Sequence, residues 1–170
     1  APASAAEPLR LGLAEASEGG QGPVGVQEPA WSQDGKRIAL SYLDRVWTLA
    51  ADGKQPKALT SIDGGVEREP ACSPDGTKVA FAADRGNGFD IFVVGMKNGV
   101  AAGAPTVVTN TPGDERWPSW TPDGRIVFAH RAAPAAGHNG DASLQYDLFV
   151  TRPSESGDAW EPAMALTETS

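Results

Sequence analysis

One sequence pattern occurs three times in this chain and constrains its fold more than any other feature. The copies are PAWSQDGKRIALS at 29–41, PACSPDGTKVAFA at 70–82 and PSWTPDGRIVFA at 118–129. Pro29, Pro70 and Pro118 open them, at intervals of 41 and 48 residues. Self-similarity at such a period indicates one supersecondary unit repeated along the chain.

Each copy is centred on a tight turn, SQDG, SPDG or TPDG. Proline presets φ in such turns, aspartate bonds its own backbone, and glycine supplies a positive φ. The flanking runs are rich in Ile, Val and Phe and predict strands, with each proline as the first residue of its strand. Third strands are expected within 44–53, 89–99 and 146–157, and short polar edge strands at 57–60, 106–109 and 164–167.

The fold class that follows is all-β, a β-propeller with three four-stranded blades. A content of 20 Gly and 14 Pro supports many short strands over long helices. The predicted blades are 28–62, 63–111 and 112–167. Residues 1–27 are expected to be an irregular lead-in, in which the alternating LRLGL at 9–13 is either a ring-closing strand or part of a disordered N-terminus.

The pattern P-x-W-S-P-D-G-x-x-I-A-F, followed by D-I-F-V and L-T, resembles the blade repeat of TolB-like propellers. Such propellers also occur in tricorn-type proteases and in certain amidohydrolases and prolyl-oligopeptidase-like enzymes. The resemblance covers about residues 28–167. This sequence departs from the pattern at Gln33, Cys72, Thr121 and an insertion at 131–143. The resemblance implies a ring of six or more blades, so the expected partners are further blades on this or a second polypeptide, or a second copy in a homodimer.

Charge and composition exclude some classes of function. The net charge of −8 argues against nucleic-acid binding. No apolar run reaches the roughly 18–20 residues that a membrane-spanning helix needs. The first residues, APASAAEP, resemble the mature side of a signal-peptidase cut and predict a periplasmic or extracellular protein, with a trimmed chain as the alternative.

No catalytic residue, metal site or cofactor is predicted. Cys72 stands where Trp31 and Trp120 stand in the sister repeats and is interpreted as a small buried hydrophobe. The spacing of four residues around the insertion fits no standard metal site and favours a surface loop. These four are His130, His138, Asp141 and Asp147. Three potential Ca²⁺ ligands in ADRGNGFD favour a hairpin turn instead. They are Asp84, Asn87 and Asp90.

The residues just before the anchoring prolines are the candidate binding site. They read VQEP at 26–29, EREP at 67–70 and ERWP at 115–118, where the innermost strand of a blade begins beside the central channel. The candidates are Gln27, Glu28, Arg68, Glu69, Arg116 and Trp117. The alternative is that Arg and Glu only pair across adjacent blades and solvate the rim.

The sequence therefore predicts a non-catalytic scaffold or binding module for a protein or peptide partner, within a larger exported protein. One alternative is the N-terminal propeller portion of a hydrolase, either an amidohydrolase or a serine peptidase, with its catalytic residues outside this chain. Another is a self-associating structural half-propeller.

Overall fold

The structure, a computed structural model, describes residues 25–60, 65–133 and 145–168, and all regular elements in these ranges are β-strands. Blade 1 consists of β1 (Gln27–Trp31), β2 (Arg37–Tyr42), β3 (Arg45–Ala50) and β4 (Lys57–Ala58). Blade 2 consists of β5 (Val66–Cys72), β6 (Lys78–Asp84), β7 (Phe89–Lys97), β8 (Val100–Ala101) and β9 (Thr106–Val107). Blade 3 consists of β10 (Gly113–Trp120), β11 (Ile126–Ala132), β12 (Asp147–Thr151) and β13 (Met164–Ala165).

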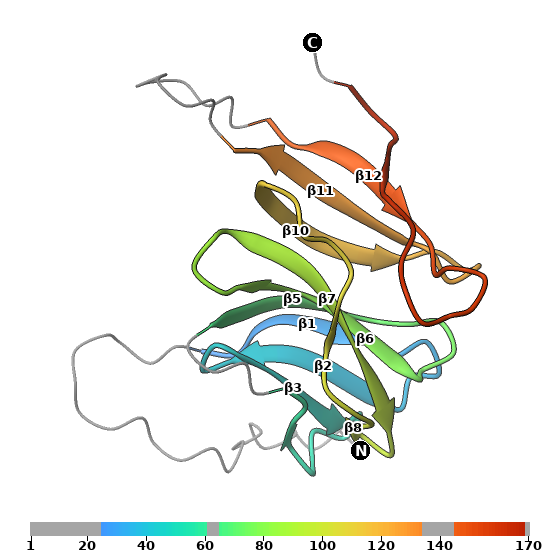
Figure 1. The fold of residues 1–170 in the computed structure, drawn as a ribbon. Helices are drawn as coiled ribbons and strands as arrows, with labels where there is room; N and C mark the ends of the chain where they lie inside the picture. The colour runs from blue at the N-terminus through green and yellow to red at the C-terminus, as the bar shows by residue number, and fades with distance from the viewer. Residues whose placement is uncertain (1–24, 61–64, 134–144, 169–170) are drawn as a thin grey trace, which may run out of the picture.

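The strands form three antiparallel sheets that stack in chain order (Figure 1). Blades 1 and 3 are four-stranded meanders, ordered β1-β2-β3-β4 and β10-β11-β12-β13. The predicted all-β propeller fold is confirmed. Blade 2 has one strand more than expected, because β8 pairs with the end of β7 while β9 takes the place of the short edge strand.

The three predicted turns are built alike. Asp34 Oδ1 accepts the hydroxyl of Ser32 at 2.7 Å and the backbone N–H of Lys36 at 3.0 Å. Asp75 makes the same two contacts with Ser73 and the N–H of Thr77. Gln33 therefore replaces proline in the first turn without changing its hydrogen bonds.

The prolines do not open the first strands as the sequence suggested. Each first strand begins two or more residues earlier, so that Pro29, Pro70 and Pro118 lie inside it. The pairing register shifts at all three places, which marks a β-bulge. A bulge interrupts the ladder of hydrogen bonds where proline has no N–H to contribute, so the residue is tolerated within the strand.

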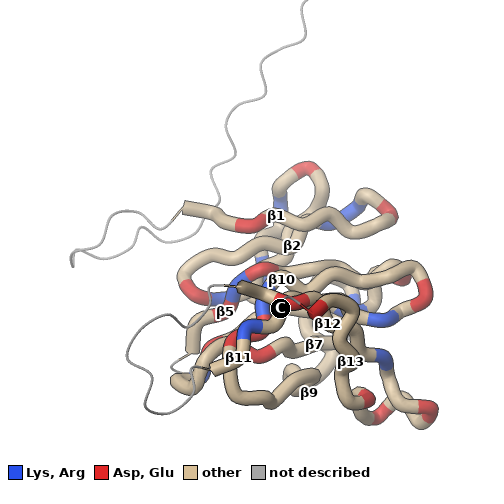
Figure 2. Tube along the Cα trace, turned by 90° about the horizontal axis from the view of Figure 1, so that it is seen from above, with Lys and Arg blue, Asp and Glu red and all other residues tan. Residues whose placement is uncertain are grey.

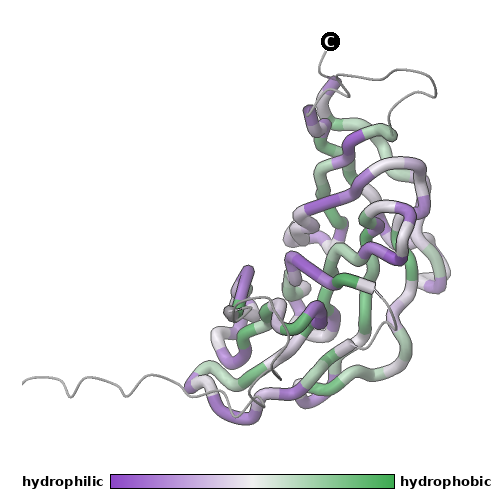
Figure 3. Tube along the Cα trace, turned by 90° about the vertical axis from the view of Figure 1, so that its left-hand side faces the viewer, coloured by the Kyte–Doolittle hydropathy of each residue, from purple (hydrophilic) through white to green (hydrophobic). Residues whose placement is uncertain are grey.

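Blade 2 is buried on both faces because β6 alternates its side chains between two cores. Val79, Phe81 and Ala83 pack with residues of blade 1, such as Val46. The intervening alanines of β6 pack with Ile126 and other residues of blade 3. Hydrophobic segments run through the stacked sheets (Figure 3).

The outer blades expose large apolar side chains. Trp31 of blade 1 is 59% exposed, and in blade 3 Leu148, Met164 and Leu166 are also exposed. The proposed ring-closing strand at 9–13, most of the insertion at 131–143, and the side chains of His138 and Asp141 lie outside the described residues.

Candidate binding site at the inner edge of the blades

Each bulge places its middle residue in a left-handed backbone conformation. These residues are Glu28, Glu69 and Trp117, with φ of 54°, 57° and 52°. A positive φ is uncommon outside glycine, and a sparsely populated backbone conformation costs about 1–3 kcal/mol. Contacts from neighbouring groups must therefore hold the three bulges in place.

Two glutamates supply such contacts, and each one joins a blade to the next. Glu28 Oε2 accepts the backbone N–H of Glu69 at 2.7 Å. Glu69 Oε2 in turn accepts the backbone N–H of Trp117 at 2.6 Å. We call this repeated contact the rim staple. Blade 3 has no carboxylate at the equivalent position, because Trp117 stands there.

Both candidate arginines form ion pairs between blades. Arg116 of blade 3 donates Nε and Nη2 to the Glu69 carboxylate of blade 2, with the Nε to Oε1 distance 2.9 Å. Arg68 of blade 2 donates to Asp44 of blade 1 at 2.6 Å. Basic and acidic segments accordingly lie beside one another around β5, β10 and β11 (Figure 2). These contacts match the alternative in which Arg and Glu pair across adjacent blades.

Trp117 differs from the other candidates because it is 53% exposed although its backbone is fixed by Glu69. Its ring meets that of Tyr146 edge-on, with centroids 5.0 Å apart. The guanidinium of Arg116 lies 5.3 Å from the Trp117 ring and that of Arg131 lies 5.3 Å from the Tyr146 ring. The structure thus brings Arg116 and Trp117 together with two residues that the sequence analysis missed.

Gln27 opens β1 and is exposed, opposite Ser41 in the strand pairing. Arg131 and Tyr146 were missed because Arg131 is the first residue of the insertion and Tyr146 follows its end, so they lie 14 and 29 residues after Trp117 in the sequence. A tyrosine directly before the D-L-F-V segment was the only signal that could have pointed to this site.

A second repeated contact lies deeper between the blades, and we call it the carboxylate latch. The threonine that ends each short edge segment, KALT or TVVT, accepts a backbone N–H from the third strand of its own blade: Thr60 from Val46 at 3.1 Å, and Thr109 from Ile91 at 2.8 Å. A fully buried glutamate of the next blade then accepts a hydrogen bond from the hydroxyl of this threonine.

Glu67 completes the first latch and Glu115 the second. Glu67 Oε2 accepts the N–H of Val46 at 2.9 Å and the hydroxyl of Thr60. Glu115 accepts the hydroxyl of Thr111 and lies 3.5 Å from that of Thr109. Each glutamate stands three residues before its proline. Neither glutamate was among the six candidates from the sequence, although both open the segments that contain them, and the structure buries both.

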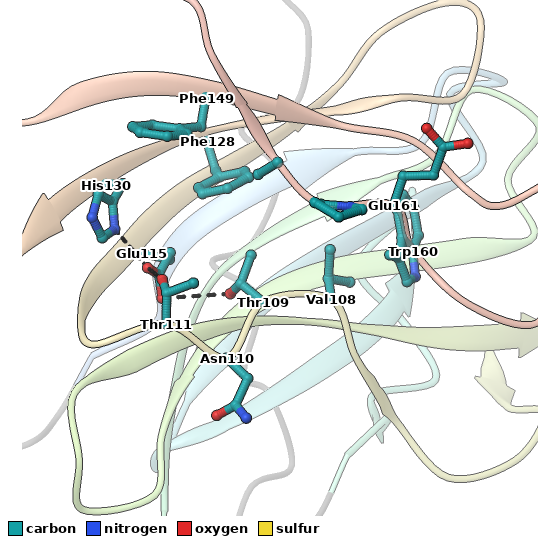
Figure 4. A pocket seen from close by; sticks show the side chains of 12 residues that line it. Val108, Thr109, Asn110, Thr111, Glu115, Phe128, His130, Phe149, Trp160 and Glu161 are labelled. Atoms are coloured by element: carbon teal, nitrogen blue, oxygen red, sulfur yellow. Dashed lines mark hydrogen bonds and ion pairs between the residues drawn. The ribbon is translucent and has the colours of Figure 1, made fainter. Parts of the chain in front are cut away.

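A pocket of about 400 Å³ lies beside the second latch, between blades 2 and 3 (Figure 4). Phe128, Phe149 and Trp160 form its apolar wall, and His130 Nδ1 lies 2.6 Å from Glu115 Oε1. His130 belongs to β11, so its interpretation as a surface-loop residue was wrong; the strand pairs it with Glu115 of β10.

Burial, and then hydrogen bonding and repulsion from the nearby Glu115, raise the pKa of Asp90 to about 6. This carboxyl group therefore holds a proton more readily than an ordinary aspartate. Glu115 and His130 contact one another on neighbouring strands of blade 3, and Glu115 also reaches Thr109 of blade 2, so these side chains serve blade packing in this structure. They do not present a nucleophile with its base.

The remaining candidates have structural surroundings. Cys72 packs against the core between blades 1 and 2, and burial raises the pKa of its thiol to about 11, the opposite of thiolate activation. Asp84 accepts the N–H of Gly86 at 2.6 Å and that of Gly88 at 3.2 Å, as a hairpin turn requires. Within the described ranges, no helix is long and apolar enough to cross a bilayer.

Comparison with known proteins decides the type of propeller. The chain is 29% identical over 128 residues to tricorn protease homolog 1 of Streptomyces coelicolor, covering 74% of this chain and 11% of that protein. The solved structure of a putative TolB from Agrobacterium tumefaciens superposes with a TM-score of 0.67 at 20% identity, covering 86% of this chain and 50% of that one. TolB from Acinetobacter baumannii gives 0.61 at 21% identity, with 85% and 33% covered.

The described blades have the fold of TolB-like β-propeller blades. No protein-family model matches this chain. The TolB-like blades span about a tenth of the curated relative and half of the Agrobacterium chain. The likeness to TolB therefore describes the fold, while ligands and activity must be argued from the residues of this chain.

Proposed function

We propose that these TolB-like blades form a non-catalytic module that binds a protein or peptide partner at its inner edge, around Trp117 and Tyr146. The six sequence candidates lie on the first strands of the three blades, but four of them are engaged between blades. Glu28 and Glu69 hold bulges, and Arg68 and Arg116 form ion pairs. Trp117 is the one whose ring is left available to a partner.

The main support for this proposal is that blade 3 has an exposed tryptophan, Trp117, at the bulge position where the other two blades have a glutamate. Blades 1 and 2 have Glu28 and Glu69 at the bulge, whereas blade 3 has Trp117 with the same backbone conformation. Exposing a large aromatic ring at a rigid position is unfavourable in water and favourable at an interface, where tryptophan is enriched among hot spots. Since the neighbouring arginines are paired with carboxylates, we expect apolar contact to dominate recognition.

Replacement of Trp117 by alanine should weaken peptide binding by about 30-fold, the effect of losing a hot-spot residue worth 2 kcal/mol. Random peptides displayed on phage would be selected on the wild-type protein, and the affinity of the best synthetic peptides would be measured by calorimetry. Trp31→Ala is the matched control, because Trp31 is as exposed and also lies on a first strand.

Equal affinity of the selected peptides for the wild type and for Trp117→Ala would contradict the proposed site. A loss of similar size in Trp31→Ala would contradict it as well, because the effect would then belong to exposed tryptophans in general. Circular dichroism of both variants would verify that the strands are intact.

The second candidate function is the propeller portion of a hydrolase, which the similarity to a tricorn protease homolog favours. In that case the module would gate or present substrate to catalytic residues that lie outside this chain. Peptidase assays of the full protein would separate the two candidates, since the binding module alone releases no product. Export to the periplasm or the outside stays a prediction, which cell fractionation would test.

A further inference from the structure

The face of blade 3 that points away from blade 2 repeats the receiving half of the carboxylate latch. Leu148 donates its backbone N–H to Thr167 Oγ1 at 2.9 Å. This contact is equivalent to those from Val46 to Thr60 and from Ile91 to Thr109, which differ from it by about 0.2 Å or less. Thr167 ends MALT at 164–167, the segment of blade 3 that corresponds to KALT and TVVT.

The burial of equivalent residues shows what this face lacks. Ile91 lies in the third strand of blade 2, two residues after its start at Phe89, and is 0% exposed because blade 3 covers it. Leu148 occupies the same place in blade 3 and is 45% exposed. Met164 and Leu166 of the last strand segment are exposed beside it. Burying these side chains is favourable at about 25 cal/mol per Å² of apolar surface. The face is therefore suited to being covered by another blade, as blade 3 covers blade 2.

We propose that this face of blade 3 docks a further β-blade whose first strand carries a glutamate three residues before its proline. In both interfaces of this chain the covering blade has that spacing, as Glu67 with Pro70 and Glu115 with Pro118. The incoming carboxylate would accept the Thr167 hydroxyl and approach the Leu148 N–H, as Glu67 does with Thr60 and Val46. This inference does not depend on the proposed ligand site at Trp117.

A second copy of this chain does not fit the face. In a head-to-tail pair, blade 1 of one copy would cover blade 3 of the other. The residue three positions before Pro29 is Val26, which is 43% exposed and has no acceptor oxygen in its side chain. The interface that closes a three-plus-three ring would thus lack the carboxylate latch that both interfaces within this chain contain.

Site-specific photo-crosslinking in the full protein tests this inference. Leu148 would be replaced by p-benzoyl-phenylalanine, the protein irradiated, and the crosslinked peptide sequenced by mass spectrometry. Met164 provides a second site in case the first variant does not fold, and Val100, which is 41% exposed on blade 2, provides the control.

We expect both sites on blade 3 to crosslink to a peptide that contains Glu-x-x-Pro and does not come from residues 25–168, whether it belongs to the same polypeptide or another one. The yield should exceed that of the Val100 control by at least tenfold. Crosslinking to residues 25–31 of a second copy would overturn the inference in favour of self-pairing. Yields no higher than at Val100 would overturn it in favour of an uncovered face.

Discussion

Replacement of Phe81 by alanine should lower the free energy of unfolding by about 3–5 kcal/mol. Phe81 is fully buried between blades 1 and 2, and its ring stacks on Phe92 with centroids 5.9 Å apart. Truncation removes the apolar contact and leaves a cavity, because the backbone of a central strand cannot collapse to fill it. Urea denaturation of wild type and variant would measure the loss.

Two companion variants make this result specific. Phe81→Leu should lose less stability and remain folded if the alanine variant does not. Val107→Ala, which truncates a half-exposed side chain of the same blade, should stay within about 0.5 kcal/mol of the wild type. A loss below about 1 kcal/mol in Phe81→Ala would mean that blades 1 and 2 do not share this core.

Replacement of Glu67 by alanine should lower the free energy of unfolding by about 2–4 kcal/mol, although removing a carboxylate from water is itself unfavourable. The carboxylate of Glu67 accepts hydrogen bonds from Val46 and Thr60 of the preceding blade. Alanine leaves the buried Thr60 hydroxyl without its acceptor and the Val46 N–H with only Thr60 Oγ1, and an unsatisfied buried group costs about 1–3 kcal/mol. Denaturation in urea would again be the measurement.

Glu67→Gln should recover part of this stability, because its amide oxygen can accept the same hydrogen bonds. Glu161→Ala is the matched control, since Glu161 pairs with Arg152 on the surface and a surface ion pair contributes about 0–1 kcal/mol. If Glu67→Ala and Glu161→Ala were equally stable, the carboxylate latch would have no energetic role between blades 1 and 2.

The repeated turns and strands were predictable because their causes are local. In each turn one aspartate accepts a hydrogen bond from the hydroxyl of the residue two positions before it. In the first two turns it also accepts the backbone N–H of the residue two positions after it, whereas in the third Asp123 pairs with the side chain of Arg125. The Ser32 hydroxyl, then the Lys36 N–H, lower the pKa of Asp34, and Ser73 and Thr77 do so for Asp75. Such contacts are encoded within five residues, so the sequence pattern is sufficient to read them.

The strand β8 was missed although its signal is also local. Asn98 and Gly99 have φ of 54° and 75°, the left-handed pair that a tight hairpin turn requires. The turn folds Val100 and Ala101 back onto the end of β7. The repeat pattern predicted four strands for the second blade because it was taken from features that all three blades share, and the other two blades have no Asn-Gly turn at this point.

The candidate site was only partly predictable because its decisive contacts join different blades. Sequence analysis placed Arg68 on the rim and did not single out Glu67, and the structure buries Glu67 against Thr60 while Arg68 pairs with Asp44. Nothing within the EREP segment indicates that Glu67 is buried while Arg68 forms an ion pair at the rim. Both outcomes depend on the preceding blade, whose position only the stacked fold defines.

Residue-resolved amide hydrogen exchange tests most directly whether carboxylates join consecutive blades. The amide of Val46 donates to Glu67 and to Thr60, which Glu67 holds in place, and the amide of Trp117 donates to Glu69. In the full protein both amides should be protected. Glu67→Ala should accelerate exchange at Val46 by at least about tenfold without affecting Trp117, and Glu69→Ala should do the reverse. Free exchange of both amides in the wild type, or acceleration at both sites in either variant, would contradict the blade-to-blade contacts described above.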